Sequence, residues 1–287
     1  MRKKKKNLGK RVTVLLIAIV LLAVFCYFEN NSIVITNIKY TNKKIPNSFN
    51  GYKVLQVSDL HNKEFGENQW KLIKLTKEIV PDIIVITGDL IDSRKTDIAT
   101  AMEYVSEAVK IAPVYFVSGN HEKWSSKYTE LSKELAEAGV KIIDNEGTII
   151  EKDGEKISLL GLQDIDFIPY DYVEDSTDYK FQEKLSELSM NVSNEFCILL
   201  SHRPEKIDLY ADKNIDLVFS GHAHGGQFRI PFVGGLVAPN QGFFPKYTRG
   251  LYVKGDTSMV VSRGLGNSII PLRIFNRPEL VVVTLND

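Results

Sequence analysis

The stretch Lys53-Val54-Leu55-Gln56-Val57-Ser58-Asp59-Leu60-His61 is a nearly continuous apolar run followed by a short polar segment. Four further runs of this kind lie at 82–87, 113–118, 197–201 and 216–220. Short runs that are rich in β-branched residues and close on a polar residue are typical of strands buried on both faces. The sequence therefore predicts a central set of buried strands.

Helical periodicity fills the gaps between the early runs. It covers 72–80 before Pro81, 102–109 before Pro113, and 126–138 before Gly139. Further strand and turn signals follow residue 227, with apolar runs at 258–262 and 280–285. Because neither a repeat nor a linker divides residues 33–287, we expect one α/β domain there, with two sheets packed face to face between helices.

The composition excludes several classes of protein. A chain of 287 residues that is 44% hydrophobic and 25% charged is globular rather than disordered. Seven of the 36 basic residues fall in the first eleven positions, which leaves 29 basic against 36 acidic residues in the rest. An acidic body is poorly suited to phosphate backbones, so no nucleic-acid polymer is expected as a partner. Cys26 and Cys197 lie in apolar runs, which argues against disulfides and cysteine metal clusters.

The N-terminus has the pattern of an uncleaved signal anchor. A basic tail at 1–11 precedes residues 12–28, which carry no charge and as a helix would span about 25 Å, near the short limit for a bilayer core. Basic flanks stay in the cytoplasm, so we expect a single-pass protein of the cell membrane with its body on the extracytoplasmic side. The bulky residues 25–28 disfavour the alternative of a cleaved signal peptide, and a buried core helix is a more distant third.

Residue types that bind metals follow each of the five predicted strands. They are Asp59 and His61, then Asp89, then Asn120 and His121, then His202, and finally His222 and His224. All five histidines of the chain are in these segments. Because ligands gather outside the carboxyl ends of strands in open α/β sheets, we expect the five segments to converge on one site.

The spacing and chemistry of these residues indicate two metal ions. Residues i and i+2 of an extended segment point the same way, so Asp59 with His61, and His222 with His224, can each present two ligands to one cavity. Imidazoles, carboxylates and an amide oxygen without a thiolate suit Mn²⁺, Fe²⁺ or Zn²⁺. Seven ligand groups are too many for one ion with an open position, and two ions sharing a carboxylate fit the count.

The series D-x-H, G-D-x-x-D, G-N-H-E, a lone His and G-H-x-H, from about Val54 to His224, resembles the calcineurin-like metallophosphoesterase superfamily. The extension G-H-A-H-G-G-Q at 221–227, together with the N-terminal segment, is similar to the bacterial membrane-associated branch typified by YkuE-like phosphodiesterases. The resemblance implies a four-layer αββα sandwich of two mixed β-sheets flanked by helices. It also implies one ion held by Asp59, His61, Asp89 and His224, and a second held by Asp89, Asn120, His202 and His222.

Two further residues receive catalytic roles from the resemblance. It implies that His121 faces the substrate, where it stabilises phosphoryl charge or protonates the leaving oxygen, and that Asp92 orients its imidazole. A helix-capping or surface role explains Asp92 nearly as well. Ser93 and Arg94 depart from the protein-phosphatase form G-D-x-x-D-R-G, which argues against a phosphoprotein substrate.

These observations predict a metal-dependent phosphoric ester hydrolase, foremost a phosphodiesterase or pyrophosphatase, in which a metal-bridging hydroxide attacks phosphorus in line. The substrate alternatives are a glycerophosphate-type wall polymer, a lipid-linked pyrophosphate and a diffusible nucleotide diester. The competing function is a catalytically inactive metal-binding scaffold of the same fold. The scaffold is disfavoured because no ligand position is missing from the motif series.

Two other groups of residues leave alternatives open. Arg203, Arg249, Arg263 and Arg273 can clamp phosphate oxygens, with Arg203 the first to test, or can be surface or structural arginines. The apolar segment 228–244 is compatible with a loop that enters the membrane interface or accepts a lipid chain, and also with strand packing in the second sheet.

Overall fold

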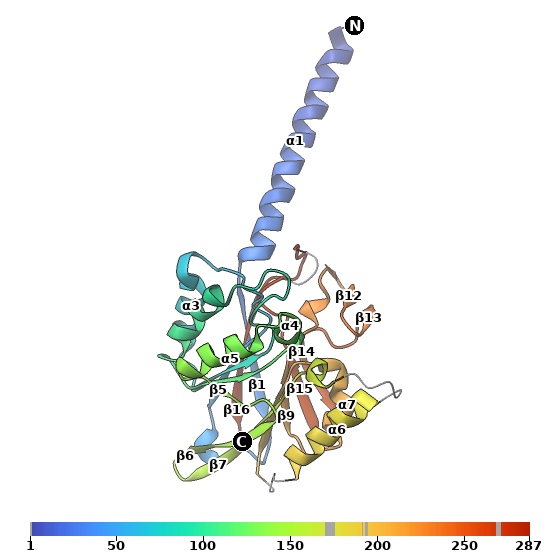
Figure 1. Ribbon diagram of the computed structural model, residues 1–287. Coiled ribbons are helices and arrows are strands. Elements are labelled where there is room, and N and C mark those ends of the chain that lie inside the picture. Colours follow the sequence, from blue (N-terminus) through green and yellow to red (C-terminus); the bar gives the residue numbers. More distant parts are fainter. Residues whose placement is uncertain (1, 170–175, 191, 193–194, 268–270) are drawn as a thin grey trace.

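The computed structural model describes residues 2–169, 176–190, 192, 195–267 and 271–287. Helix α1 (Arg2–Asn31) projects from one end of the body (Figure 1). In the described part of the chain, α1 is the one helix long and apolar enough to cross a membrane, over Lys10–Asn31. This helix contains residues 2–11 of the predicted basic tail and the whole predicted span 12–28, and it continues to Asn31.

Two six-stranded mixed sheets form the centre of the body. The first has the order β1 (Val34–Thr41), β16 (Glu279–Asn286), β2 (Lys53–Val57), β3 (Ile83–Thr87), β4 (Val114–Val117) and β5 (Lys141–Ile142). The second has the order β14 (Gly250–Lys254), β15 (Thr257–Val261), β9 (Leu217–Ser220), β8 (Cys197–Ser201), β7 (Glu155–Leu162) and β6 (Glu146–Lys152). The five predicted strands are observed as β2, β3, β4, β8 and β9. The first and last residues of each strand differ from the predicted ones by at most one position.

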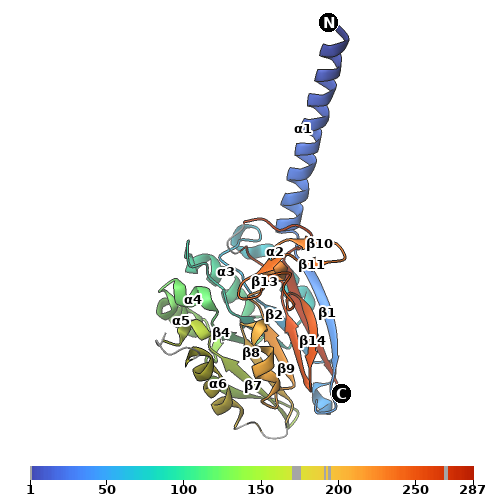
Figure 2. The ribbon, with the colours of Figure 1, turned by 90° about the vertical axis from the view of Figure 1, so that its right-hand side faces the viewer.

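Apolar side chains fill the spaces between four layers. In β3, Ile83 and Val85 pack between the two sheets, whereas Ile84 and Ile86 face the outer helices. The helices α2 (Trp70–Ile79), α3 (Ile98–Ala108) and α5 (Tyr128–Glu137) cover the outer face of the first sheet, and α6 (Ser176–Ser189) and α7 (Ile207–Ala211) cover that of the second (Figures 1 and 2). Burial on both faces explains why the strands are continuous apolar runs. The predicted αββα sandwich is confirmed.

The segment 228–244 does not join the second sheet. It forms two small hairpins, in which β10 (Arg229–Ile230) pairs with β11 (Gly234–Gly235) and β12 (Val237–Ala238) pairs with β13 (Gly242–Phe243). Strand packing in the second sheet, the interpretation that the sequence favoured for this segment, is therefore wrong.

The strand directions bring the end of α1 and the ends of the ligand-bearing strands together. Strand β1 starts just after α1 and runs away from it, and β16 is parallel to β1. Because β2 is antiparallel to β16, and β3 and β4 are parallel to β2, these three strands end on the α1 side of the body. The candidate site consequently lies at the end from which α1 projects (Figure 1).

Candidate metal centre

The loops at this end of the body bring all seven predicted ligand residues to one buried place. Three of these loops leave the first sheet, after β2, β3 and β4, and two leave the second, after β8 and β9. None of the seven residues is more than 6% exposed. They are Asp59, His61, Asp89, Asn120, His202, His222 and His224.

The first group of donor atoms comes from Asp59, His61, Asp89 and His224, and all four atoms lie within 4.8 Å of one another. The Nε2 atoms of His61 and His224 are 3.1 Å apart. His224 Nε2 is 3.4 Å from Asp59 Oδ1, and His61 Nε2 is 3.6 Å from Asp89 Oδ2. Two ring nitrogens that face each other beside two carboxylates have the chemistry of a cation site.

The second group comes from Asp89, His202 and His222. His202 Nε2 is 3.2 Å from Asp89 Oδ2 and 3.2 Å from His222 Nδ1. Among the described residues, the buried Oδ1 of Asn120 has no hydrogen-bond partner. A buried amide oxygen left without a partner costs free energy, so this atom fits a ligand position. Asp89 belongs to both groups, which places its carboxylate between two candidate ions.

Hydrogen bonds behind the rings fix which nitrogen faces the site. His202 Nδ1 donates to the carbonyl oxygen of Thr87 at 2.7 Å, which directs Nε2 toward Asp89. The Asp89 carboxylate outweighs the effect of burial and raises the pKa of His202 to about 10, so a metal bound at Nε2 would displace a proton. His222 Nε2 donates to Asn240 Oδ1 at 2.9 Å, which leaves Nδ1 for a metal. Burial lowers the pKa of His61 to about 3 and the pKa of His222 well below its ordinary value. These imidazoles are neutral, which is the form that binds metals.

The backbone around the ligands is strained. Five ligand residues have φ values between 46° and 65°, in the left-handed region. For a residue with a side chain this conformation costs about 1–3 kcal/mol, and such residues cluster at functional sites. The five are Asp59, His61, Asp89, His222 and His224. Gly221 permits the close approach that the site requires, because a Cβ there would overlap the side chains of Ser58 and Asp59.

Glu122 ties two of the ligand loops together, a role that the sequence analysis did not assign. Its carboxylate accepts hydrogen bonds from the backbone N–H groups of Asp89 and Leu90, both at 2.8 Å, and of Gly119 at 2.7 Å. These bonds fix the loop after β3 against the loop after β4, and so fix Asp89 relative to Asn120. Glu122 is the last residue of the G-N-H-E motif, so a signal was present in the sequence.

His121 lies beside the first group, and Ser93 fixes its ring. The rings of His121 and His61 pack edge to face with centroids 4.4 Å apart. His121 Nδ1 accepts a hydrogen bond from the Ser93 N–H at 3.1 Å, so Nε2 carries the proton. Asp92 Oδ2 is 3.9 Å from this Nδ1, too long for a hydrogen bond, and Asp92 instead binds Arg94 at 2.9 Å. The catalytic roles of His121 and Asp92 stay predictions.

Arg203 is a structural arginine behind the second group. It is 2% exposed, and its Nε and Nη2 atoms donate to the Asp164 carboxylate at 2.7 and 2.8 Å. Its Nη1 donates to Asn240 Oδ1 at 2.9 Å, the same oxygen that accepts from His222. Arg203 therefore supports the orientation of His222, and its guanidinium is occupied by protein partners.

The last turn of α1 and the segment before β16 brace the first group. Asn276 Nδ2 donates to the carbonyl oxygen of His224 at 2.7 Å, and the Asn276 N–H donates to Glu29 Oε2 at 2.9 Å. The buried Arg273 donates to the carbonyl oxygen of Arg263 at 3.0 Å, and Arg263 pairs with Glu279. Both of these arginines are structural, and the end of α1 is part of the body.

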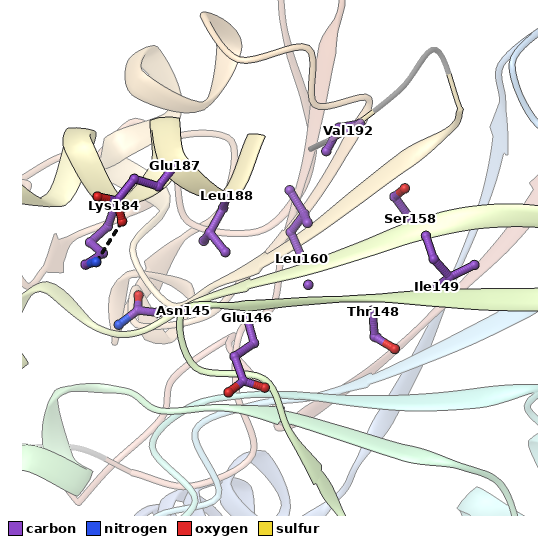
Figure 3. Close-up of a pocket in the computed structure, with 11 residues that line it drawn as sticks. Asn145, Glu146, Thr148, Ile149, Ser158, Leu160, Lys184, Glu187, Leu188 and Val192 are labelled. Atoms are coloured by element: carbon purple, nitrogen blue, oxygen red, sulfur yellow. Dashed lines mark hydrogen bonds and ion pairs between the residues drawn. The ribbon is translucent and has the colours of Figure 1, made fainter. Parts of the chain in front are cut away.

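Two pockets differ in their relation to the metal centre. One of about 730 Å³ is lined by His61, Asp92 and Arg94 and offers a substrate access to the ligands. Another of about 500 Å³ lies among β6, β7 and α6 (Figure 3), and no predicted site residue lines it. Two of its three charged residues, Lys184 and Glu187, bind each other at 2.7 Å. The first of these pockets belongs to the site.

Buried carboxylates and imidazoles at the ends of two packed sheets are the arrangement of a metal-dependent phosphoester hydrolase. Residues 52–226 match the family model described as Calcineurin-like phosphoesterase. The chain belongs to this family, whose members depend on two metal ions. Its enzyme class, predicted from the motif series, is confirmed.

Relatives agree with this assignment, and a solved structure has the same fold. The chain is 34% identical to the uncharacterized metallophosphoesterase YkuE of Bacillus subtilis, over 90% of this chain and 87% of the relative. It is 26% identical to the phosphodiesterase YaeI of Escherichia coli, over 82% of each chain. A Danio rerio protein named transmembrane protein with metallophosphoesterase domain is 29% identical over 85% of this chain and 55% of its own length. The crystal structure of TT1561 from Thermus thermophilus shares the fold, with a TM-score of 0.51 and 14% identity over 75% of this chain and 90% of that chain.

Proposed function

We propose that this phosphoester hydrolase is a membrane-anchored phosphodiesterase or pyrophosphatase. Residues 12–28 cross the bilayer, the basic tail 1–11 stays in the cytoplasm, and the metallophosphoesterase domain 33–287 faces the extracytoplasmic side. Exposed apolar side chains along α1 and the basic cluster before them support this topology. The substrate is a phosphodiester or pyrophosphate, either lipid-linked or derived from the cell wall.

The shared position of Asp89 carries the proposal of a dinuclear site. Its Oδ2 is 3.6 Å from His61 Nε2 in the first group and 3.2 Å from His202 Nε2 in the second. The donor set, without a thiolate, fits Mn²⁺, Fe²⁺ or Zn²⁺. When bound, two such ions acidify an attacking water and neutralise charge on the transferring phosphoryl group.

His121 supplies the proton that hydrolysis requires. Because the Ser93 N–H occupies Nδ1, the protonated Nε2 is free to donate to the leaving oxygen or to a phosphoryl oxygen. The ring lies against that of His61, which places it beside the first ligand group. Asp92 and Arg94 line the adjoining pocket, where they contact the leaving group of the substrate.

Elemental analysis followed by hydrolysis assays tests the proposal. The full chain in detergent should bind two ions and should hydrolyse bis-p-nitrophenyl phosphate or a nucleoside-diphosphate lipid faster than p-nitrophenyl phosphate. A preference for the monoester would contradict the diesterase and pyrophosphatase assignment. Metal-loaded protein that is inert toward all three compounds would favour the alternative function, an inactive scaffold.

A further inference from the structure

A set of large apolar side chains is exposed on the two small hairpins and on the segment before β16. We call this set the apolar rim, and its residues are Ile230, Phe232, Val233, Phe243, Phe244 and Phe275. Phe232, between β10 and β11, is fully exposed, and Phe243 is 76% exposed. Four of the six, Ile230, Phe232, Val233 and Phe275, line one pocket. Large exposed apolar side chains gathered in this way mark contact with a partner or a membrane.

The apolar rim lies at the α1 end of the body. Figures 1 and 2 show the hairpins β10–β11 and β12–β13 at the end from which α1 projects. The ring of Phe275 packs edge to face on Phe25 of α1, with centroids 5.4 Å apart. Phe25 belongs to the proposed membrane span, so Phe275 lies at the depth of the last turns of that span.

The backbone at three of these aromatic residues is in an unfavourable conformation. Phe232, Phe244 and Phe275 have φ values of 67°, 53° and 51°, in the left-handed region. Bulky residues rarely adopt this conformation, and strain of this kind is found at functional sites. Exposed rings also gain little from packing within the body. Transfer of the rings from water to an apolar environment would compensate for the strain.

Unpaired positive charge accompanies the apolar rim. A pocket of about 510 Å³ is lined by Arg229 and Arg249 together with Phe232 and Phe275. Arg229 donates to the carbonyl oxygen of Gly225 at 2.7 Å, and within the described ranges neither arginine forms an ion pair with an acidic side chain. Arginines bind phosphate groups well, and apolar walls suit an acyl chain. This combination is complementary to an anionic phospholipid.

We propose that the apolar rim enters the interfacial region of the bilayer beside α1, with Arg229 and Arg249 in contact with lipid phosphates. The proposal rests on the anchoring by α1 proposed above. Asn240, between β12 and β13, binds the ligand His222, so a docked rim holds the metal centre at the membrane surface. A phosphoester on a lipid headgroup then reaches the ligands without leaving the plane of the bilayer.

Environment-sensitive labels on the full chain in phosphatidylcholine–phosphatidylglycerol nanodiscs test this docking. In a Cys26→Ala background, in which Cys197 is buried, the single substitutions Phe232→Cys, Val20→Cys and Ile149→Cys each carry the fluorophore NBD. Position 20 lies in the proposed span. Ile149 is 51% exposed on β6, where it pairs with Ser158 beside the start of β8, away from the strand ends that carry the candidate ligands. The neutral quencher acrylamide should quench labels at 232 and 20 about threefold less than the label at 149.

The pattern of quenching separates the two proposals. If position 20 is protected and position 232 is quenched like position 149, the docking is overturned and the anchoring stands. If positions 20 and 232 are both quenched like position 149, the anchoring fails, and the docking with it. Arg249→Gln should reduce protection at 232 in nanodiscs that contain phosphatidylglycerol and leave it unchanged in pure phosphatidylcholine. Equal protection of this variant and the parent in both lipids would overturn the contact with lipid phosphates.

Discussion

The two sheets supply different chemistry to the metal centre. Loops of the first sheet provide the candidate oxygen ligands and one imidazole, from Asp59, Asp89, Asn120 and His61. Loops of the second sheet provide imidazoles alone, from His202, His222 and His224. The first and second groups of donor atoms each combine residues from both sheets, whereas a further cluster of His61, Asp92 and His121 comes from the first sheet alone. Packing of one sheet on the other therefore assembles the site, which no local segment forms by itself.

The supports behind these ligands also differ. In the first sheet, the Glu122 carboxylate binds backbone N–H groups and holds whole loops in place. In the second sheet, side chains hold individual ligands, since Asn240 binds the ring of His222 and Asn276 binds the carbonyl oxygen of His224. A substitution of Glu122 should therefore disturb the geometry of both ligand groups. A substitution of Asn240 or Asn276 should disturb only the group whose ligand it supports.

Asp89→Asn is expected to have the largest effect, because Asp89 alone belongs to both groups. Loss of its charge should lower kcat/KM for bis-p-nitrophenyl phosphate by about 1,000-fold or more, while circular dichroism shows an unchanged fold. Asp256→Asn, which changes an exposed carboxylate in the turn between β14 and β15, serves as the control and should retain activity. Near-normal turnover of metal-supplied Asp89→Asn would refute the shared carboxylate.

Arg203→Met should destabilise the second sheet and its ligand group. The substitution leaves the Asp164 carboxylate buried without its partner, which costs about 3–5 kcal/mol in the free energy of unfolding. Urea unfolding in detergent measures this loss. The double variant Arg203→Met/Asp164→Leu should recover part of the stability, since no unpaired charge remains. A single variant as stable as the parent would show that the buried pair contributes nothing.

Asn276→Ala and Asn240→Ala test whether the two groups have separate supports. Each variant removes one hydrogen bond behind a ligand, and such losses typically weaken metal binding about 10- to 100-fold. In a two-step calorimetric titration with Mn²⁺, Asn276→Ala should weaken one step and Asn240→Ala the other. If both variants weaken the same step, the division between the groups is wrong.

Asp92→Asn should have the smallest effect. Asp92 makes no hydrogen bond to His121, so we expect kcat/KM to fall by about fivefold or less. His121→Asn provides the comparison, with an expected loss of about 100-fold or more. Equal losses in the two variants would restore the orienting role that the resemblance implies for Asp92.

The ligand residues were predictable because each follows a strand that the sequence marks clearly. Apolar runs buried on both faces locate the strands, and the polar residues at their ends are the candidate ligands that the fold brings together. The supports were not predictable in this way. Asp164 is 39 residues from Arg203 and Asn276 is 247 residues from Glu29, so only tertiary packing brings these partners together.

The ambiguity of segment 228–244 has a different cause. Its apolar composition is compatible with a buried strand and with an exposed hairpin, because both contain Phe, Val and Gly. Pairing decides between them, and Phe232 and Phe243 lie in two hairpins that, in the described part of the chain, are separate from both six-stranded sheets. The end of α1 was ambiguous for a similar reason. The polar residues after 28 do not mark a helix in the sequence, but in the structure the helix extends to Asn31, and Glu29 accepts a hydrogen bond from Asn276 of the body.

Anomalous diffraction from crystals of the full chain grown with Mn²⁺ tests the central claim most directly. We expect two manganese peaks about 3.5–4 Å apart, with the Asp89 carboxylate between them and ligands from both sheets around each. A single peak, or two peaks that do not share Asp89, would contradict a dinuclear site assembled by the packing of the two sheets.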